Sequence, residues 1–210
     1  MDDLAVEGEI DEVGKFRTVL TLEDVAEGGI KRFKNVDEIF DISGGRLLLK
    51  DELKRLKHHL WNRYGVRLRL VDVDQALKTK KTITRNGKKI SKLEDWNSRN
   101  VVGSFREGPP PELFLRRSYA SELTVFHEMV HLRYWFDKKP KVHFAQEEVI
   151  VFDEIWKTKD RWTNQELLES YEYVFDILQQ SSLKKDFKSF TDKYSSEINQ
   201  IRTKIQFGIQ

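Results

Sequence analysis

The sequence contains no cysteine, few prolines and no long apolar run. Without thiols the chain can form neither a disulfide nor a thiolate zinc site, so a metal ion would need histidine and carboxylate ligands. No apolar run approaches the length that crosses a membrane, which predicts a soluble protein without membrane contacts. Residues 1–4 also lack the basic and apolar regions of a signal peptide, so we expect any export to use another route.

Charged residues are abundant but nearly balanced over the 210 residues. They make up 34 % of the sequence, yet the formal net charge is only +2, so bulk charge identifies no partner. The distribution is uneven, because residues 1–45 carry a formal charge of −7 and the remainder +9. We interpret residues 1–45 as an acidic leader or linker that ends at Gly44-Gly45. A hydrophobic share of 39 % predicts a folded domain after it.

A His-Glu-x-x-His motif at residues 127–131 is the strongest chemical signal in the chain. Its surroundings contain no glycine or proline and are rich in apolar residues, which predicts a buried helix capped near Ser118. A spacing of four residues places His127 and His131 on one helix face, where both imidazoles can bind one metal ion. Glu128 is then positioned to take a proton from a water molecule at the metal. The alternative is a pair of structural histidines.

A third protein ligand must follow, because catalytic zinc normally takes three and keeps a fourth position for water. We predict Glu148, since apolar residues stand three, four and seven positions after it and mark it as facing the interior. Glu147 is the alternative ligand. Carboxylates that could instead hold a histidine N–H are Glu147, Glu154 and Asp153.

Other possible ligands fit the pattern less well. Asp137 lies six residues after His131, the spacing of the peptidases that continue the motif with x-x-Gly-x-x-His/Asp. Tyr134 stands where those enzymes have the glycine that turns the chain, so the helix should continue and carry Asp137 away. His58 and His59 fall in another predicted helix and are expected to be solvated.

Hydrophobic patterns predict an α+β fold, with a small, mostly antiparallel sheet followed by a helical half that carries the motif. Predicted strands cover residues 66–73, 101–105 and 113–116, and a hairpin with an Asn-Gly turn covers 83–90. Predicted helices cover residues 51–64, the motif segment, 144–157, 164–180 and 187–205. We assign residues 46–182 to the metal-binding domain and 183–210 to a C-terminal amphipathic helix that docks on the body or on a partner.

Two segments have candidate binding roles. An exposed edge strand formed by Leu113, Phe114 and Leu115 would bind an extended substrate through backbone hydrogen bonds, with an ordinary sheet strand as the alternative. The basic residues between Lys78 and Lys92 favour a solvated hairpin face over a nucleic-acid interface, because no nucleic-acid-binding motif accompanies them.

Residues from about 47 to 178 resemble the zincin-like metallopeptidase toxin domains of bacterial polymorphic toxins. The resemblance rests on the apolar strand 113–116, the run Thr124-Val125-Phe126-His127-Glu128, the acidic helix 146–152 and the segment 162–167. It implies a zincin-like fold with one Zn²⁺ bound by His127, His131 and Glu148. Relatives usually have a second acid two residues before the presumed ligand, where this chain has Gln146.

These observations predict a zinc-dependent metallopeptidase with Glu128 as general base, and His143 and Tyr171 as candidates for assisting the oxyanion. The resemblance further implies delivery out of the producing cell, a protein substrate in the cytoplasm of a target cell, and a cognate immunity protein. A binding module built on an inactive zincin scaffold is the alternative. A basic nucleic-acid-binding domain is a third and weaker hypothesis.

Overall fold

The computed structural model describes residues 9–10, 16–17, 41–71, 82–85, 87–98 and 101–208. Most of the acidic segment 1–45 lies outside these residues, as do residues 78–81 and 86 of the basic group. Within the acidic segment, β1 (Glu9–Ile10) pairs antiparallel with β2 (Phe16–Arg17).

The central sheet has three strands in the order β3-β7-β6. β3 (Arg67–Leu70) runs parallel to β7 (Glu112–Leu115), and β6 (Gly103–Arg106) runs antiparallel to β7. The predicted α+β class is therefore confirmed, but the main sheet is mixed rather than mostly antiparallel. The chain between β3 and β7 is long enough for the crossover that a parallel pair requires.

That crossover contains the predicted hairpin. β4 (Thr82–Arg85) pairs antiparallel with β5 (Lys88–Ser91), apart from the central sheet. Gly87 in the turn has φ +75°, a conformation that glycine adopts without strain. The short helix α3 (Lys92–Ser98) follows at once.

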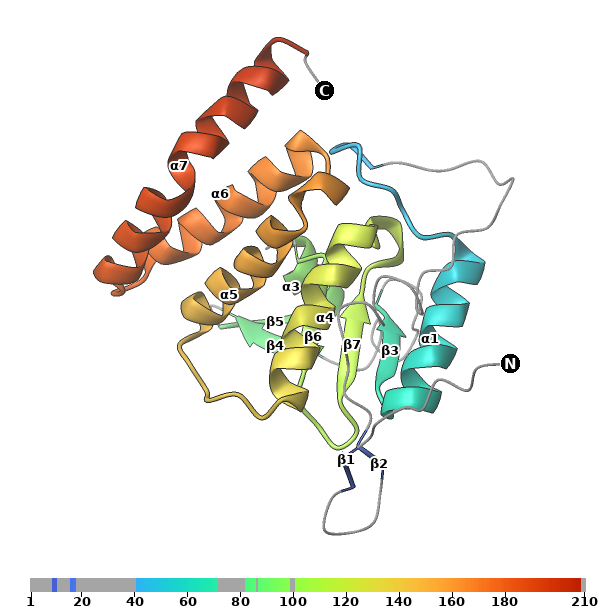
Figure 1. Ribbon diagram of the computed structural model, residues 1–210. Coiled ribbons are helices and arrows are strands. Elements are labelled where there is room, and N and C mark those ends of the chain that lie inside the picture. The colour runs from blue at the N-terminus through green and yellow to red at the C-terminus, as the bar shows by residue number, and fades with distance from the viewer. Residues whose placement is uncertain are drawn as a thin grey trace.

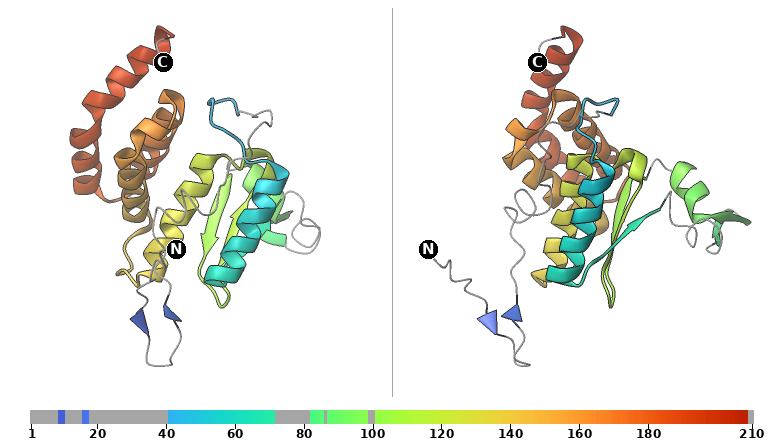
Figure 2. Two further views of the ribbon diagram at one scale, coloured as in Figure 1. Left: turned by 45° about the vertical axis from the view of Figure 1, so that its right-hand side comes forward. Right: turned by 90° about the vertical axis from the view of Figure 1, so that its right-hand side faces the viewer.

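Helices cover both faces of the sheet. Figure 2 shows α1 (Lys50–Tyr64) and α4 (Glu122–Phe136) on one face, and α3 with the hairpin on the other. Alternation along β7 matches this arrangement, because Leu113 and Leu115 join the main core while Phe114 packs on Trp96 of α3. The end of α1 at Gly65 agrees with the predicted helix 51–64, and Trp61 on this helix is 49 % exposed.

The helical half follows α4 in sequence and in space (Figure 1). It consists of α5 (Phe144–Lys157), α6 (Asn164–Gln180) and α7 (Lys184–Gln206). A capping box begins α6, where the Thr163 hydroxyl and the Glu166 carboxylate each accept the other residue's backbone N–H. The amphipathic prediction for the last helix also holds, since α7 buries Phe190, Tyr194, Ile198 and Ile201 in the main core.

The start of α4 differs from the prediction. Ser121 caps the helix by accepting a hydrogen bond from the Thr124 N–H at 3.1 Å. Ser118 lies instead in the preceding 3₁₀ turn η2 (Arg117–Tyr119). A second 3₁₀ turn, η3 (Lys159–Arg161), connects α5 to α6.

Candidate metal centre

Helix α4 brings the two motif histidines together. His127 and His131 are one turn apart, and their Nε2 atoms lie 3.2 Å from each other. Buried apolar residues of α4 hold the helix against the core, and His131 itself is only 8 % exposed. The helix continues past Tyr134 to Phe136, as predicted. Asp137 consequently lies exposed at its C-terminus, outside the metal-binding group.

Helix α5 supplies the carboxylate. Glu148 is 2 % exposed and shares the buried face of α5 with Val151, Phe152 and Ile155. Its Oε2 lies 3.3 Å from Nε2 of His127, and its Oε1 lies 3.5 Å from Nε2 of His131. The side chains of His127, His131 and Glu148 thus converge on one point from two helices.

The three side chains fit a metal ion. Ligands at about 2.0–2.1 Å from a tetrahedral zinc are about 3.3 Å from one another, close to the spacings observed here. The Oε2 atom of Glu148 is buried and makes no hydrogen bond in the described structure, so it retains an unused ligand position. His127, His131 and Glu148 therefore form a group that could hold a metal ion.

Glu147 orients one of these histidines. Its Oε1 lies 2.7 Å from Nδ1 of His131, which directs the opposite ring nitrogen toward the metal position. Of the two roles predicted for Glu147, alternative ligand or partner of a histidine, this contact fits the second, since Glu147 meets the opposite nitrogen of the ring from Glu148.

The pKa values of His131 and Glu148 are shifted in opposite directions. Burial opposes the charged form of His131, but hydrogen bonds to Glu147 and Glu148 outweigh it and raise the pKa to about 10. Burial likewise favours a neutral Glu148, yet the nearby imidazoles of His127 and His131 lower its pKa to about 2. A metal ion binds neutral imidazole and ionised carboxylate, so its binding would release the proton held by His131.

Glu128 lies beside the group without joining it. The side chain is 5 % exposed, accepts a hydrogen bond from the backbone N–H of Phe105, and leaves Oε2 without a hydrogen bond in the described structure. Burial raises its pKa to about 6, although His127 and His131 oppose the shift. A carboxyl group with this pKa can accept and return a proton near neutral pH.

Gly103 of β6 leaves the space that Glu128 occupies. A Cβ atom at this position would lie 2.5 Å from Oε1 of Glu128 and 2.8 Å from its Cγ. The edge strand of the sheet and the candidate base are thus in direct contact. The sequence alone does not predict this role of Gly103, because the contact joins segments that are distant in sequence.

A cleft of about 980 Å³ opens at this point. His127, Glu128 and Glu148 line part of it. The other walls come from residues 41–47, the segment before β6, η2 and helix α6. Such a volume can accommodate a short stretch of polypeptide rather than water alone.

The chain shows no match to any family model, curated protein or solved structure. The fold and the site are thus characterised by their own geometry. None of the described helices combines the length and apolar character needed to span a bilayer.

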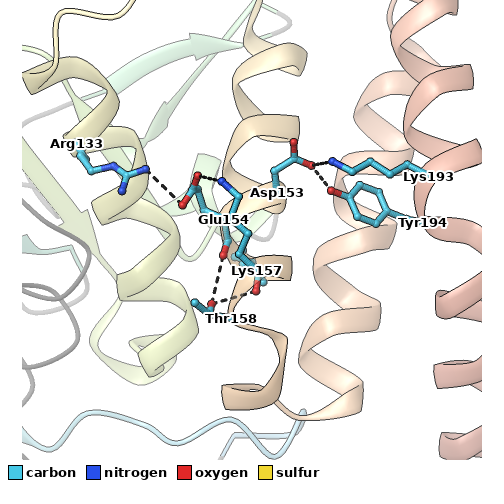
Figure 3. Close-up of polar contacts among 8 residues, drawn as sticks. Arg133, Asp153, Glu154, Lys157, Thr158, Lys193 and Tyr194 are labelled. Carbon is cyan, nitrogen blue, oxygen red and sulfur yellow. Dashed lines mark hydrogen bonds and ion pairs between the residues drawn. The ribbon is translucent and has the colours of Figure 1, made fainter.

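Two of the predicted histidine partners have other roles (Figure 3). Glu154 pairs with Arg133 of α4 at 3.4 Å and with Lys157 at 2.6 Å. Asp153 lies on the opposite side of α5, where it pairs with Lys193 at 3.0 Å and accepts a hydrogen bond from the Tyr194 hydroxyl. Both carboxylates connect helices and neither contacts a metal-binding histidine.

The prediction that Leu113, Phe114 and Leu115 form an exposed edge strand is also wrong. Leu113, Phe114 and Leu115 belong to β7, which has a paired strand on each side and buried side chains on both faces. Both backbone edges of β7 are therefore occupied. The edge strand next to Glu128 is β6, which the sequence predicted as a strand but not as the edge.

The candidates for oxyanion assistance lie away from the cleft. Tyr171 is 3 % exposed and its hydroxyl lies 3.2 Å from Oγ of Ser195 on α7. His143 is exposed and caps α5 by accepting the Ala145 N–H. Tyr173, two residues after Tyr171, instead lines the cleft with its ring centroid 6.1 Å from that of His127. His58 and His59 on α1 also lie outside the metal-binding group.

Proposed function

We propose that this protein is a zinc-dependent endopeptidase. The observation that carries the proposal is a buried carboxyl group, Glu128, beside a His-His-Glu group in the wall of a peptide-sized cleft. A structural zinc site has no need of an additional buried acid with an unused oxygen. A hydrolytic site does need one, because a base must take the proton of the attacking water.

His127, His131 and Glu148 would hold the ion, and Glu147 would fix the ring of His131. Bound zinc supplies a Lewis acid that polarises the scissile carbonyl and lowers the pKa of a coordinated water. Glu128 accepts the proton of the attacking water and passes it to the departing amine. Tyr173 offers a hydroxyl on the wall beside His127, where it would donate to the carbonyl oxygen.

Strand β6 would align the substrate. Its edge opposite β7 is unpaired among the described strands, and its first residue, Gly103, contacts Glu128. An extended peptide pairing with this edge would pass the candidate base at close range. This assigns to β6 the role that the sequence suggested for β7.

The motifs at residues 113–116, 124–128, 146–152 and 162–167 support a toxin or effector role. In this proposal the substrate is a protein in the cytoplasm of a target cell, and a cognate immunity protein protects the producer. The acids lining the cleft argue against a nucleic-acid substrate, whose phosphates they would repel.

The test uses a library of peptides, made by cutting a bacterial proteome after its acidic residues. The wild type and Glu128→Gln are compared in their cleavage of this library. We expect the wild type to cleave a defined set of peptides and Glu128→Gln to be slower by about 10²–10⁴-fold, because the general base is lost. Zinc content and unfolding temperature should stay unchanged, and Glu154→Gln on α5 should keep full activity. Equal cleavage by Glu128→Gln would contradict the proposal, and bound zinc without cleavage of any peptide would favour the binding module.

A further inference from the structure

The charged groups that line the cleft are predominantly acidic. Apart from His127, Tyr119 and Tyr173, the ionisable lining groups are all carboxyl groups, and no lysine or arginine is among the described lining residues. Glu128 and Glu148 belong to the metal centre. The remaining acids are Asp41, Glu166 and Glu169, which we call the acidic wall.

The acidic wall is built by two segments that are distant in sequence. Asp41 accepts the backbone N–H groups of Ser43 and Gly45 at 3.0 and 2.8 Å. Glu169 accepts the Ser43 hydroxyl at 2.6 Å, and Glu166 accepts the Thr163 N–H at 2.9 Å. Within the described structure all three carboxylates bond to neutral donors and none pairs with a basic side chain.

The carboxylates of the acidic wall lie close together. A Cβ atom on Gly45 would be 2.2 Å from Oε1 of Glu166 and 3.1 Å from Oδ2 of Asp41, so both oxygens lie over the same glycine. Burial raises the pKa of Glu166, and the nearby Asp41 and Glu122 carboxylates add to the shift. A cation placed here would relieve this repulsion.

Helix geometry gives the distance from the acidic wall to the metal centre. Tyr173, which packs near His127, is seven residues after Glu166 on the same face of α6, and seven residues rise about 10 Å. On α5, Glu148 and Ile155 are likewise seven residues apart, and both line the cleft. At about 3.3 Å per residue, 10 Å corresponds to roughly three residues of extended peptide.

A second observation marks the same cleft as a ligand site. Glu128 is 5 % exposed and its Oε2 is without a hydrogen bond in the described structure, although this residue lines the cleft. A buried carboxylate oxygen of this kind is stabilised when a bound molecule supplies the missing partner.

We propose that the acidic wall is a specificity subsite that binds a lysine or arginine side chain of the substrate, two or three residues from the bond that is cleaved. The inference rests on the peptidase function proposed above. The neutral donors fix the three carboxylates in place, so the cationic side chain meets oxygens that are already oriented. A basic segment of a target protein is thus the preferred substrate.

In the experiment, the sequences of the peptides that the wild type cleaves are aligned on the cleaved bond. We expect lysine and arginine to be enriched two or three positions from that bond on one side. The charge reversal Glu169→Lys should lower kcat/KM for such a peptide about tenfold, and less for the same peptide with arginine replaced by glutamine. Glu172→Lys is the matched control, because Glu172 is exposed on α6 and pairs with Arg202 outside the cleft.

Peptide binding to zinc-loaded Glu128→Gln gives a second readout that does not require turnover. Fluorescence anisotropy would compare a neutral peptide carrying one arginine with the same peptide carrying glutamate. Tighter binding of the arginine peptide, lost in the double variant with Glu169→Lys, supports the acidic wall even if the wild type cleaves nothing. Cleavage without a basic preference, or equal binding of both peptides, overturns the inference while leaving the peptidase proposal intact.

Discussion

At the scale of single residues, Glu147 and Glu148 are neighbours with different roles. Glu148 contacts Nε2 of both histidines, whereas Glu147 bonds to the opposite nitrogen of His131. We expect Glu147→Ala to weaken zinc binding about 10–100-fold, because the ring of His131 loses its orienting partner. Competition with a chromophoric chelator measures the affinity. Glu154→Ala on the same helix should leave it unchanged, and an equal loss in both variants would contradict this role of Glu147.

Gly103 gives a second prediction at this scale. In Gly103→Ala the new methyl group would lie 2.5 Å from Oε1 of Glu128, so this side chain must move. Displacement of a catalytic group by about 1 Å lowers turnover by roughly 10²-fold, while the metal ligands stay in place. Peptidase assays and elemental analysis should therefore show slow cleavage with full zinc content. Unchanged cleavage, or a similar loss in Ser104→Ala, would show that contact with Gly103 does not position Glu128.

The sequence predicts the metal ligands because they follow helical periodicity. His127 and His131 are one turn apart, and the apolar residues after Glu148 show which face of α5 is buried. Periodicity does not show what the facing elements carry. The sequence therefore does not show that Glu154 faces Arg133, or that Asp153 faces Lys193 and Tyr194. These partners depend on the packing of α4, α5 and α7.

At the scale of elements, a buried cluster joins the chain before α1 to the start of α4. Arg46 contacts Glu52 at 2.6 Å and Glu122 at 2.9 Å, and both Arg46 and Glu52 are buried. Glu122 also donates its backbone N–H to the Arg46 carbonyl. This cluster fixes the N-terminal end of the motif helix.

Arg46→Met should lower the free energy of unfolding by about 3–5 kcal/mol, because it leaves the Glu52 carboxylate buried without its cation. Denaturant titration measures the change. The exposed pair of Arg202 with Glu172 provides the comparison, and Arg202→Met should change stability by less than about 1 kcal/mol. Similar small effects in both variants would show that the cluster does not anchor α4.

The sequence predicts which segments form strands, but not how these strands pair in the sheet. Residues 66–73 and 113–116 have the alternating or apolar pattern of strands, but nothing local shows that they pair in parallel. The hydrogen bonds of a sheet join residues distant in sequence, so order and edge depend on packing. For this reason the sequence does not show that β7, which contains the predicted substrate strand 113–115, is central and that β6 is the edge.

At the scale of the whole molecule, one core connects α1, the sheet and the helices α4 to α7. Ile198 of α7 belongs to the same buried cluster as Leu60 of α1 and Val130 of α4, and all three are at most 1 % exposed. Aromatic contacts such as Phe152 with Tyr194, 4.9 Å apart, join α5 to α7. The last helix is thus integral to the core that supports Glu148.

Removing a side chain from this core should lower the stability of the whole molecule. Ile198→Ala is expected to lower the free energy of unfolding by about 2–5 kcal/mol, because a buried side chain is replaced by a cavity. Tryptophan fluorescence and far-UV circular dichroism should still follow one coincident transition. The exposed substitution Lys204→Ala should have little effect, and separate transitions for the two probes would show that α7 folds independently.

The most direct measurement of the central claim is the zinc content of the purified protein, for the wild type, His127→Ala and Glu148→Ala. The account predicts about one zinc per chain in the wild type and loss of the ion in both variants, because each removes one of three ligands. Circular dichroism would verify that the variants remain folded. A wild type that binds no zinc after reconstitution at neutral pH, or a Glu148→Ala protein that keeps its zinc, would contradict the proposed site.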